Sequence, residues 1–453
     1  MRKRFISVDR STPQMFPPRI DDYLPEDHLA RFVVEIVEQL DLRNLVEAYS
    51  GRGSSAYHPA MMVALLFYGY ATGTFSSRKL ERATYEGIAY RYICANSHPD
   101  HDSINSFRKR FGKELEGLFV EVLAVAREMG MVKMGTVSLD GTKVKANASR
   151  HKALSWKKAK EIEEQIKKEV EELMRLGEEA ESGSLPEDME IPKELERREG
   201  RVEVIRRAKL EIEARAKRRY EEEMEEYREK MEKRKRHEEE TGKKFGGRKP
   251  EEPGRGPGDR DQVNLVDEES RIMPGSGGGF DQSYNAQASV EGESRLIVTR
   301  HVTQNTNDKR EVEPTLEQLR ENGRLLGEAD SLLADAGYFS ESNVDACVRE
   351  GIRPYISGNR EKHNKPLWER FGREEEETEE PVTAVEEMRR RLKTMEGRKL
   401  YAKRKSTVEP VFGVIKRVMG FRQFLRRGIE SVGEEWNLVC IGYNLKRMHV
   451  LRG

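Results

Sequence analysis

The feature that most constrains the fold of this chain is a long, highly charged tract between residues 156 and 240. Such a tract cannot form the interior of a domain, because charged side chains are rarely buried. We therefore predict a projecting helical hairpin with its turn near "ESGSLPEDMEIP", followed by a Gly/Pro-rich linker at 241–260. The apolar residues form only a narrow stripe at helical spacing, which comprises Ile162, Ile166, Val170, Leu173, Ile205, Ile212, Met224, Tyr227 and Met231.

The composition of the whole chain limits the class of protein. With 453 residues the chain is long enough for two or three domains, although 36% of it is hydrophobic and another 36% is charged. Lysine plus arginine (82) equals aspartate plus glutamate (82), so only the distribution of charge can indicate a nucleic-acid surface. Three scattered cysteines form no disulfide framework and the longest apolar run is too short to span a membrane, so we expect a cytoplasmic protein.

Two regions with different hydrophobic periods flank the charged tract. After an N-terminal arm (1–20), residues 21–132 carry apolar residues at helical spacing and predict an all-α domain. From "GTVSLDGTKV" onward, a period of two predicts strands. Residues 133–155 and 261–453, with a second charged insertion at 358–400, predict an α/β (α+β) core in the order β, β, β, α, β, α, β, α. This order is typical of an RNase H-like fold, so the chain is expected to be multidomain.

Two aspartates stand where this core would place a ligand. Asp140 lies on the polar side of the first predicted strand. Asp335 ends the apolar run "DSLLADAGY", which reads as a parallel strand, and open α/β sheets bind ligands at the carboxyl ends of such strands. With Glu409 from a helix packed across them, they would form a group of three carboxylates suited to a hard divalent cation. The alternative for each aspartate alone is an ordinary turn, because "LDG" and "ADAG" are common turn sequences.

The helix of Glu409 is predicted from "KSTVEPVFGVIKR". Because proline is tolerated in a first helical turn, Pro410 predicts that the helix begins here, with Ser406 or Thr407 as its N-cap. Glu409 and Lys416 then share the face opposite the apolar residues. The competing interpretation is a solvated Glu–Lys face on a surface helix.

Several sequence blocks, in order, resemble bacterial insertion-sequence transposases of the DDE type. The resemblance covers nearly the full chain and is to the branch with a C-terminal Y-(2)-R-(3)-E-(6)-K signature. It implies that Asp140, Asp335 and Glu409 are catalytic and hold two Mg²⁺ ions, with Mn²⁺ as a substitute, and that Lys416 completes the E-(6)-K part. The blocks are "GRGSSAYHPAMMVALLFYGYATGTFSSRKLERA" with "HPDHDSINSFRKRF", then "VSLDGTKVKANAS", "SYNAQASV", "SLLADAGYFS" and "VEPVFGVIKRVMGFRQFLRRG".

The chain departs from the first half of that signature. Tyr401 and Arg404 keep their mutual spacing but stand one residue too far upstream of Glu409. Either a one-residue loop insertion preserves their roles, or Lys405 replaces the arginine as a phosphate contact. Lysine binds phosphate only as a point charge, whereas arginine binds it through two parallel hydrogen bonds.

The resemblance also implies a function and partners. The chain would bind the terminal inverted repeats of its element through the helical domain, cut the element's ends and join them to target DNA, as a homodimer in a synaptic complex at the nucleoid. The alternatives are an RNase H-like nuclease that never joins DNA, and a non-catalytic DNA-binding or scaffold derivative. Basic runs that would contact DNA, unless they are merely solvated faces, contain Arg78, Lys79, Arg108, Lys109, Arg110, Tyr401, Arg404, Lys405, Lys416, Arg417 and Arg422, with Phe421 and Phe424 interleaved.

Three other features have competing interpretations. Cys94, His98 and His101 are close in sequence, but no fourth ligand stands at zinc-finger spacing, and a turn before an N-cap at Asp102 or Ser103 explains them better. Trp156 could stack on an unpaired base, although packing between helices is the more ordinary role. The charged hairpin could dimerise or hold the second DNA end, or could be only a solvated helix pair.

Overall fold

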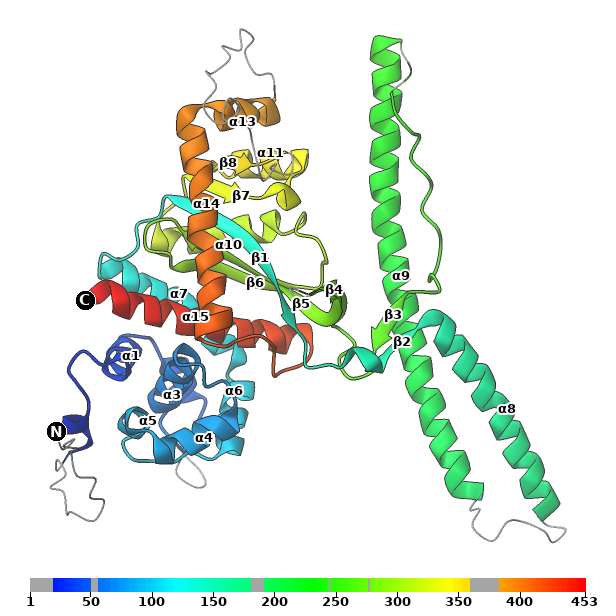
Figure 1. Cartoon of the computed structure of the whole chain (residues 1–453), viewed down its shortest axis with the longest axis horizontal. Helices are drawn as coiled ribbons and strands as arrows, with labels where there is room; N and C mark the ends of the chain where they lie inside the picture. Colours follow the sequence, from blue (N-terminus) through cyan, green and yellow to red (C-terminus); the bar gives the residue numbers. More distant parts are fainter. Residues whose placement is uncertain are drawn as a thin grey trace, which may run out of the picture. The chain divides into compact units, whose positions relative to one another are not determined.

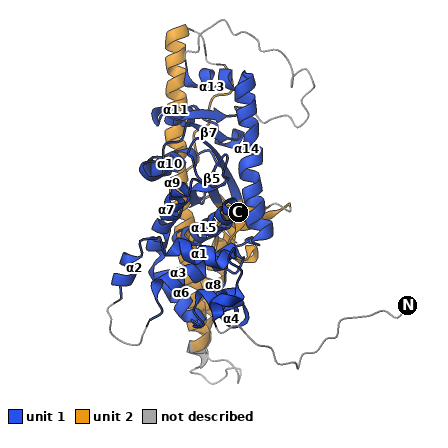
Figure 2. Ribbon diagram, turned by 90° about the vertical axis from the view of Figure 1, so that its left-hand side faces the viewer, with its two compact units in different colours: residues 1–142, 286–425, 430–453 blue, residues 143–285, 426–429 orange. Residues whose placement is uncertain are grey.

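The computed structural model describes residues 19–49, 56–180, 191–242, 244, 246–275, 278–358 and 383–453. Most of the predicted N-terminal arm, the turn of the charged hairpin and most of the second charged insertion lie outside these residues. The chain forms two compact units (Figure 2): residues 1–142, 286–425 and 430–453 make the first, and residues 143–285 with 426–429 make the second. The N-terminal helical region therefore belongs to the same unit as most of the predicted core. No described helix is long and apolar enough to cross a membrane.

The N-terminal part of the first unit is helical, as its periodicity predicts. Its most buried helix is α3, which begins at Pro59 with the His58 side chain accepting the Ala60 N–H at 3.2 Å. Asp100 caps α6 by accepting the Ser103 N–H at 2.8 Å, two residues before the first predicted cap position. The elements are η1 (Ile20–Tyr23), α1 (Leu29–Val37), α2 (Arg43–Glu47), α3 (Pro59–Ala71), α4 (Ser77–Glu86), α5 (Ile88–Ile93), α6 (His101–Arg110) and α7 (Gly112–Glu128).

A sheet follows, and its element order confirms the predicted β, β, β, α, β, α, β, α sequence (Figure 1). The spatial order in the first unit is β6-β5-β1-β7-β8, in which β1 with β7 and β7 with β8 are parallel pairs. The strands are β1 (Thr136–Lys145), β5 (Phe280–Glu291), β6 (Ile297–Thr303), β7 (Ser331–Ala334) and β8 (Arg353–Ile356), and the helices between or beside them are α10 (Val312–Leu326), η3 (Ala336–Tyr338), α11 (Glu341–Arg349) and α13 (Ala384–Lys393).

The helix that carries Glu409 corrects the prediction of its start. It is α14 (Met395–Gly413), capped by Thr394, and it packs against β7, so Pro410 lies near its end instead of in its first turn. Proline in a helix interior costs about 3 kcal/mol, but burial of Val408 and Val411 on either side of it favours continuing the helix. Ser406 and Thr407 do not act as caps, because both hydroxyls donate to the Lys403 carbonyl.

The chain then widens into a π-helical turn, η4 (Val414–Val418), and ends in α15 (Ile429–Arg452). Helix α15 is buried along most of its length and ties the helical region to the sheet. Asn437 donates from Nδ2 to the Leu115 carbonyl at 2.9 Å, and Asn444 donates to the Ile297 carbonyl at 2.8 Å. A Cβ at Gly442 would lie 2.7 Å from the backbone nitrogen of Ala71, so α15 and α3 cross with their backbones in close approach.

The second unit contains the charged tract as two helices, α8 (Trp156–Ala180) and α9 (Ile191–Thr241). They pack through Ala159 and Ile166 on α8 and Ile205 and Ile212 on α9, which belong to one apolar cluster with β2 and β3. Trp156 packs against this cluster, and the Lys209 Nζ lies 5.3 Å from its ring, so helix packing is the observed role. The remaining elements are η2 (Arg150–Lys152), β2 (Ala153–Ser155), antiparallel to β3 (Gln262–Asn264), and β4 (Arg271–Pro274), antiparallel to residues 280–283 of β5.

The close crossing at Gly442 gives a first prediction. We expect Gly442→Ala to lower the unfolding free energy by about 1–3 kcal/mol, because the new methyl group would overlap the α3 backbone. Urea unfolding of the purified protein measures the change. Gly433→Ala, on the same helix, is the matched control: its added methyl group would meet no atom within 4 Å, so it should be neutral or slightly stabilising. Equal stability of the two variants would contradict this account.

Candidate active site

The parallel pairing of β1 and β7 brings Asp140 and Asp335 together. Ser138 is paired with Leu333, and continuing this register by two residues sets Asp140 opposite Asp335. Adjacent strands lie about 4.8 Å apart, so both carboxylates start from neighbouring backbone positions. The structure thus places the two aspartates as the strand pattern predicts, at the carboxyl end of β7.

The environment of Asp140 is crowded with negative charge. Burial raises the pKa of Asp140 to about 7; a hydrogen bond from the Gly141 N–H at 2.8 Å lowers it, and the neighbouring Asp335 carboxylate raises it again. The Arg404 guanidinium lowers this pKa, and Asp308 raises it. Burial is therefore the main cause of the raised pKa of Asp140, and the carboxylates of Asp335 and Asp308 add to it.

Asp335 forms the turn that follows β7. Its Oδ1 accepts the Gly337 N–H at 2.8 Å and so caps η3, the single turn that carries Tyr338. Burial raises the pKa of Tyr338 well above its usual value, and the carboxylates of Asp308, Asp140 and Asp335 raise it further. Tyr338 is therefore a buried phenol in a negatively charged part of the site.

Asp308, which sequence reasoning missed, comes from the loop between β6 and α10. Its Oδ1 accepts the Gln287 Nε2–H at 2.8 Å, and Gln287 is fully buried on β5. The Tyr338 hydroxyl donates to the Gln287 Oε1 at 2.5 Å, which connects this loop to the turn after Asp335. An aspartate in the polar stretch "TQNTNDKRE" carries no local signal of such a role, because only the tertiary fold brings it to the other two.

Helix α14 and the turn after it supply two cations. Arg404 is 8% exposed, and its guanidinium lies 5.9 Å from the Tyr401 ring centroid. Lys416 donates to the Thr142 hydroxyl; burial lowers the pKa of Lys416, and the Asp140 carboxylate opposes that shift. Residues 395–413 are one continuous helix, so no loop insertion separates Arg404 from Glu409, and Lys405 is exposed where Arg404 is buried. The structure thus places Arg404, and not Lys405, beside the aspartates.

Glu409 is not joined to the two aspartates. Its side chain is exposed and makes no hydrogen bond or ion pair with the part of the chain that the structure describes. Among the described residues, no three His, Cys, Asp or Glu side chains already have the geometry of a metal site. Glu409 precedes Lys416 by about two helical turns, so the two side chains lie on the same side of the helix. Lys416 is close enough to Asp140 for that carboxylate to affect its pKa.

The predicted DNA contacts divide into exposed and buried residues. Arg108 is 5% exposed and donates to the Tyr70 hydroxyl, the Phe75 carbonyl and the Ser77 hydroxyl at 2.9–3.1 Å, so it is a structural side chain of the helical region. Phe421 and Phe424 are also buried, stacked edge to face, and cannot meet DNA bases. The exposed members of the predicted set are Arg78, Lys79, Lys109, Arg110, Lys405, Arg417 and Arg422.

The histidines near Cys94 have protein partners. His98 stacks on Tyr85 with ring centroids 3.9 Å apart, and the His101 Nδ1 lies 2.7 Å from the Glu81 carboxylate. Cys94 is buried, and burial raises the pKa of its thiol to about 12, so it is not a thiolate ligand at neutral pH. This arrangement agrees with the interpretation that these residues form a turn.

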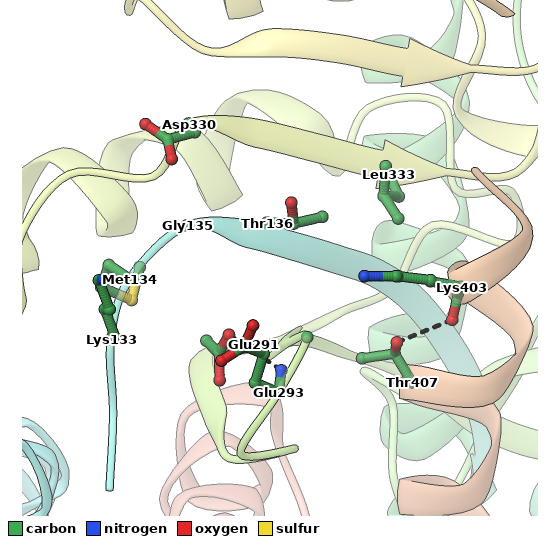
Figure 3. Close-up of a pocket in the computed structure, with 11 residues that line it drawn as sticks. Lys133, Met134, Gly135, Thr136, Glu291, Glu293, Asp330, Leu333, Lys403 and Thr407 are labelled. Carbon is green, nitrogen blue, oxygen red and sulfur yellow. Dashed lines mark hydrogen bonds between the residues drawn. The ribbon is translucent and has the colours of Figure 1, made fainter. Parts of the chain in front are cut away.

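A cavity of about 260 Å³ lies at the other end of the same strands (Figure 3). Its lining combines acidic and basic side chains, among them Glu291, Asp330, Lys133 and Lys403. Neither Asp140 nor Asp335 lines it. The carboxylate site is therefore distinct from this cavity, and Asp330, which precedes β7, provides a control residue at the opposite end of the strand.

The raised pKa of Asp140 predicts a pH-dependent stability in the absence of divalent cations. Between pH 3.8 and about 7 the Asp140 carboxyl is ionised in the unfolded chain but still protonated in the folded chain. The free energy of unfolding therefore falls as the pH rises through this range. Asp140→Asn abolishes the titration, and its stability relative to the wild type should grow from pH 5 to pH 8 by at most about 3 kcal/mol. Urea unfolding in EDTA at both pH values measures this, with Asp345→Asn, an exposed site on α11, as the control. A stability difference that is the same at both pH values would contradict the raised pKa of the buried Asp140.

Comparison with known protein families gives two matches. Residues 18–110 match a family described as a transposase domain (DUF772), and residues 258–445 match a family described as the transposase DDE domain. The second match contains Asp308, Asp335, Glu409 and Lys416, whereas Asp140 precedes it. No curated protein and no solved structure matches the chain. The sheet with its flanking helices is thus an RNase H-like core, and residues 18–110 and 258–445 are similar to the two domains of DDE-type transposases.

Proposed function

We propose that this chain binds the terminal inverted repeats of an insertion sequence and catalyses Mg²⁺-dependent cleavage of its ends and their transfer to target DNA. The observation that carries the proposal is the parallel register that sets Asp140, in the middle of β1, opposite Asp335, which directly follows β7. Burial raises the pKa of Asp140 to about 7. Carboxylates held this close are destabilised by one another and are stabilised by a cation.

The residues of the site fit a hard divalent cation. Asp140 and Asp335 offer carboxylate oxygens, the donors that Mg²⁺ and Mn²⁺ prefer, and Glu409 would add a third carboxylate from α14. A pair of such cations, when bound, would activate the attacking oxygen and stabilise the leaving oxygen of an in-line phosphoryl displacement. Glu409 would have to turn toward the aspartates, and within the described part of the chain its exposed side chain has no hydrogen bond or ion pair to lose by doing so.

The basic side chains of the site would position DNA and balance its charge. Arg404 is buried next to Asp140 and partly compensates the carboxylates before any cation is present. Lys416 is directed to the same site by its hydrogen bond to Thr142 and would contact a phosphate of the bound strand. Exposed cations of the helical region, including Arg78, Lys79 and Lys109, would hold the terminal repeat, with an affinity that falls as salt rises.

One site would serve both chemical steps. In the first step, the oxygen of water bonds to phosphorus and the 3′-oxygen leaves, which gives a 3′-hydroxyl and a 5′-phosphate. In the second, that 3′-hydroxyl bonds to a phosphorus of target DNA and displaces another 3′-oxygen, so one phosphodiester replaces another and no external energy source is required. Each of the element's two ends would be joined to the target in this way, and we therefore propose a homodimer in a synaptic complex at the nucleoid.

Single-turnover assays on labelled DNA that carries the element's end test this proposal. Asp140→Asn, Asp335→Asn and Glu409→Gln should each slow cleavage by about 10³-fold or more, because each removes charge that stabilises the transition state by several kcal/mol. Asp330→Asn on the other end of β7 and Glu396→Gln on α14 are the controls and should cleave normally. DNA binding, followed by gel shift, should survive in all five variants.

Each contrary result has a definite meaning. Undiminished cleavage by one variant would remove that residue from the mechanism. Cleavage without covalently joined products would favour a nuclease that never joins DNA. Binding of the repeat with no Mg²⁺-dependent cleavage at all would favour a non-catalytic derivative.

A further inference from the structure

A position next to the two aspartates is kept empty by a glycine. A Cβ built on Gly337 would lie 2.9 Å from the Asp335 Oδ1 and 3.9 Å from the Asp308 Oδ2. Carboxylate oxygens from two different loops therefore lie next to the space that a side chain at position 337 would occupy. Because any larger residue would fill this space, the glycine leaves room beside both carboxylates.

The orientation of Asp308 is set by a buried hydrogen-bond chain. The Tyr338 hydroxyl donates to the Gln287 Oε1 at 2.5 Å. The amide nitrogen of Gln287, Nε2, therefore faces the other way and donates to the Asp308 Oδ1 at 2.8 Å. The Gln287 main-chain carbonyl accepts the Trp436 Nε1–H at 3.0 Å, so the strand itself is also held. The amide is a neutral donor, and it therefore orients the Asp308 carboxylate without removing its charge.

The loop that carries Asp308 is fixed on both sides. Glu311, which is 2% exposed, accepts from the Asn305 Nδ2 at 2.8 Å and lies 2.8 Å from the His301 Nε2. On the other side, Asn343 of α11 donates to the Lys309 carbonyl at 2.7 Å. Asp308 thus stands on a braced segment, as a group that must keep its place in a site requires.

We propose that Asp308 is a further carboxylate of the divalent-cation site, that it acts beside Asp140 and Asp335, and that Gln287 positions it. This inference rests on the proposed function, because the cation site itself belongs to that proposal. It deepens the proposed function by naming a further carboxylate, whose Oδ2 lies 3.9 Å from the position that a Cβ on Gly337 would take beside Asp335. A bound cation would still have to draw these carboxylates together, as it would Glu409.

Binding of Mn²⁺ to the full chain, without DNA, tests the inference independently of activity. Electron paramagnetic resonance measures the unbound ion in a titration of the wild type, Asp308→Asn, Asp335→Asn and the control Asp345→Asn. Asparagine keeps the shape of the side chain and its acceptor for Gln287 but removes the charge. We expect the Kd for Mn²⁺ to rise about tenfold or more in Asp308→Asn and Asp335→Asn, and to be unchanged in Asp345→Asn.

The results separate this inference from the proposed function. Wild-type affinity in Asp308→Asn together with lost affinity in Asp335→Asn would overturn the role of Asp308 and leave the cation site intact. Wild-type affinity in both would remove the cation site, and with it the proposed function. If circular dichroism shows that Asp308→Asn is unfolded, Asp308→Glu decides, since it keeps the charge and shifts the oxygens by one methylene. A changed Mn²⁺ affinity in that variant supports the inference, and an unchanged affinity overturns it.

Discussion

The parallel register between β1 and β7 is the constraint on which the site depends. It sets Asp140 opposite Asp335 at the end of the strand pair, whereas a shift of one residue would turn one of the two side chains to the other face of the sheet. The register is in turn fixed by burial, because Val137 and Leu139 on β1 and Leu332 and Leu333 on β7 are fully buried. Packing that stabilises the core thereby also determines the distance between two like charges.

The helices then complete the surroundings of that pair. Helix α14 passes over the sheet with Arg404 on its buried side, and the π-helical turn that follows directs Lys416 to Thr142 and Asp140. A π-helical turn inserts an extra residue into the helix and is often found at functional sites. Helix α15 fixes this arrangement to the N-terminal helices through the close crossing at Gly442. Helix α15 therefore contacts both the helical region proposed to bind the repeat and the sheet that carries the carboxylates.

The sequence was sufficient for features with a local signal. The two aspartates could be placed because an alternating strand pattern and the end of an apolar run are visible in the residues themselves, and the charged tract could be recognised because it has too few apolar residues to be buried. The start of α14 was predicted wrongly, since the local rule for Pro410 is outweighed by the burial of Val408 and Val411. The roles of Arg108 and Asp308 could not be assigned from the sequence. Only tertiary packing decides which basic residue of a run is buried, as Arg108 is. Only tertiary packing brings the loop of Asp308 to Gln287 on β5.

The most direct test of the account is a crystal structure grown with Mn²⁺ and DNA that carries the element's end, with the ions located by anomalous diffraction. The account predicts anomalous peaks in contact with carboxylate oxygens of both Asp140 and Asp335, and beside Asp308. Peaks confined to other parts of the chain, or a structure in which Asp140 and Asp335 share no ion, would contradict it.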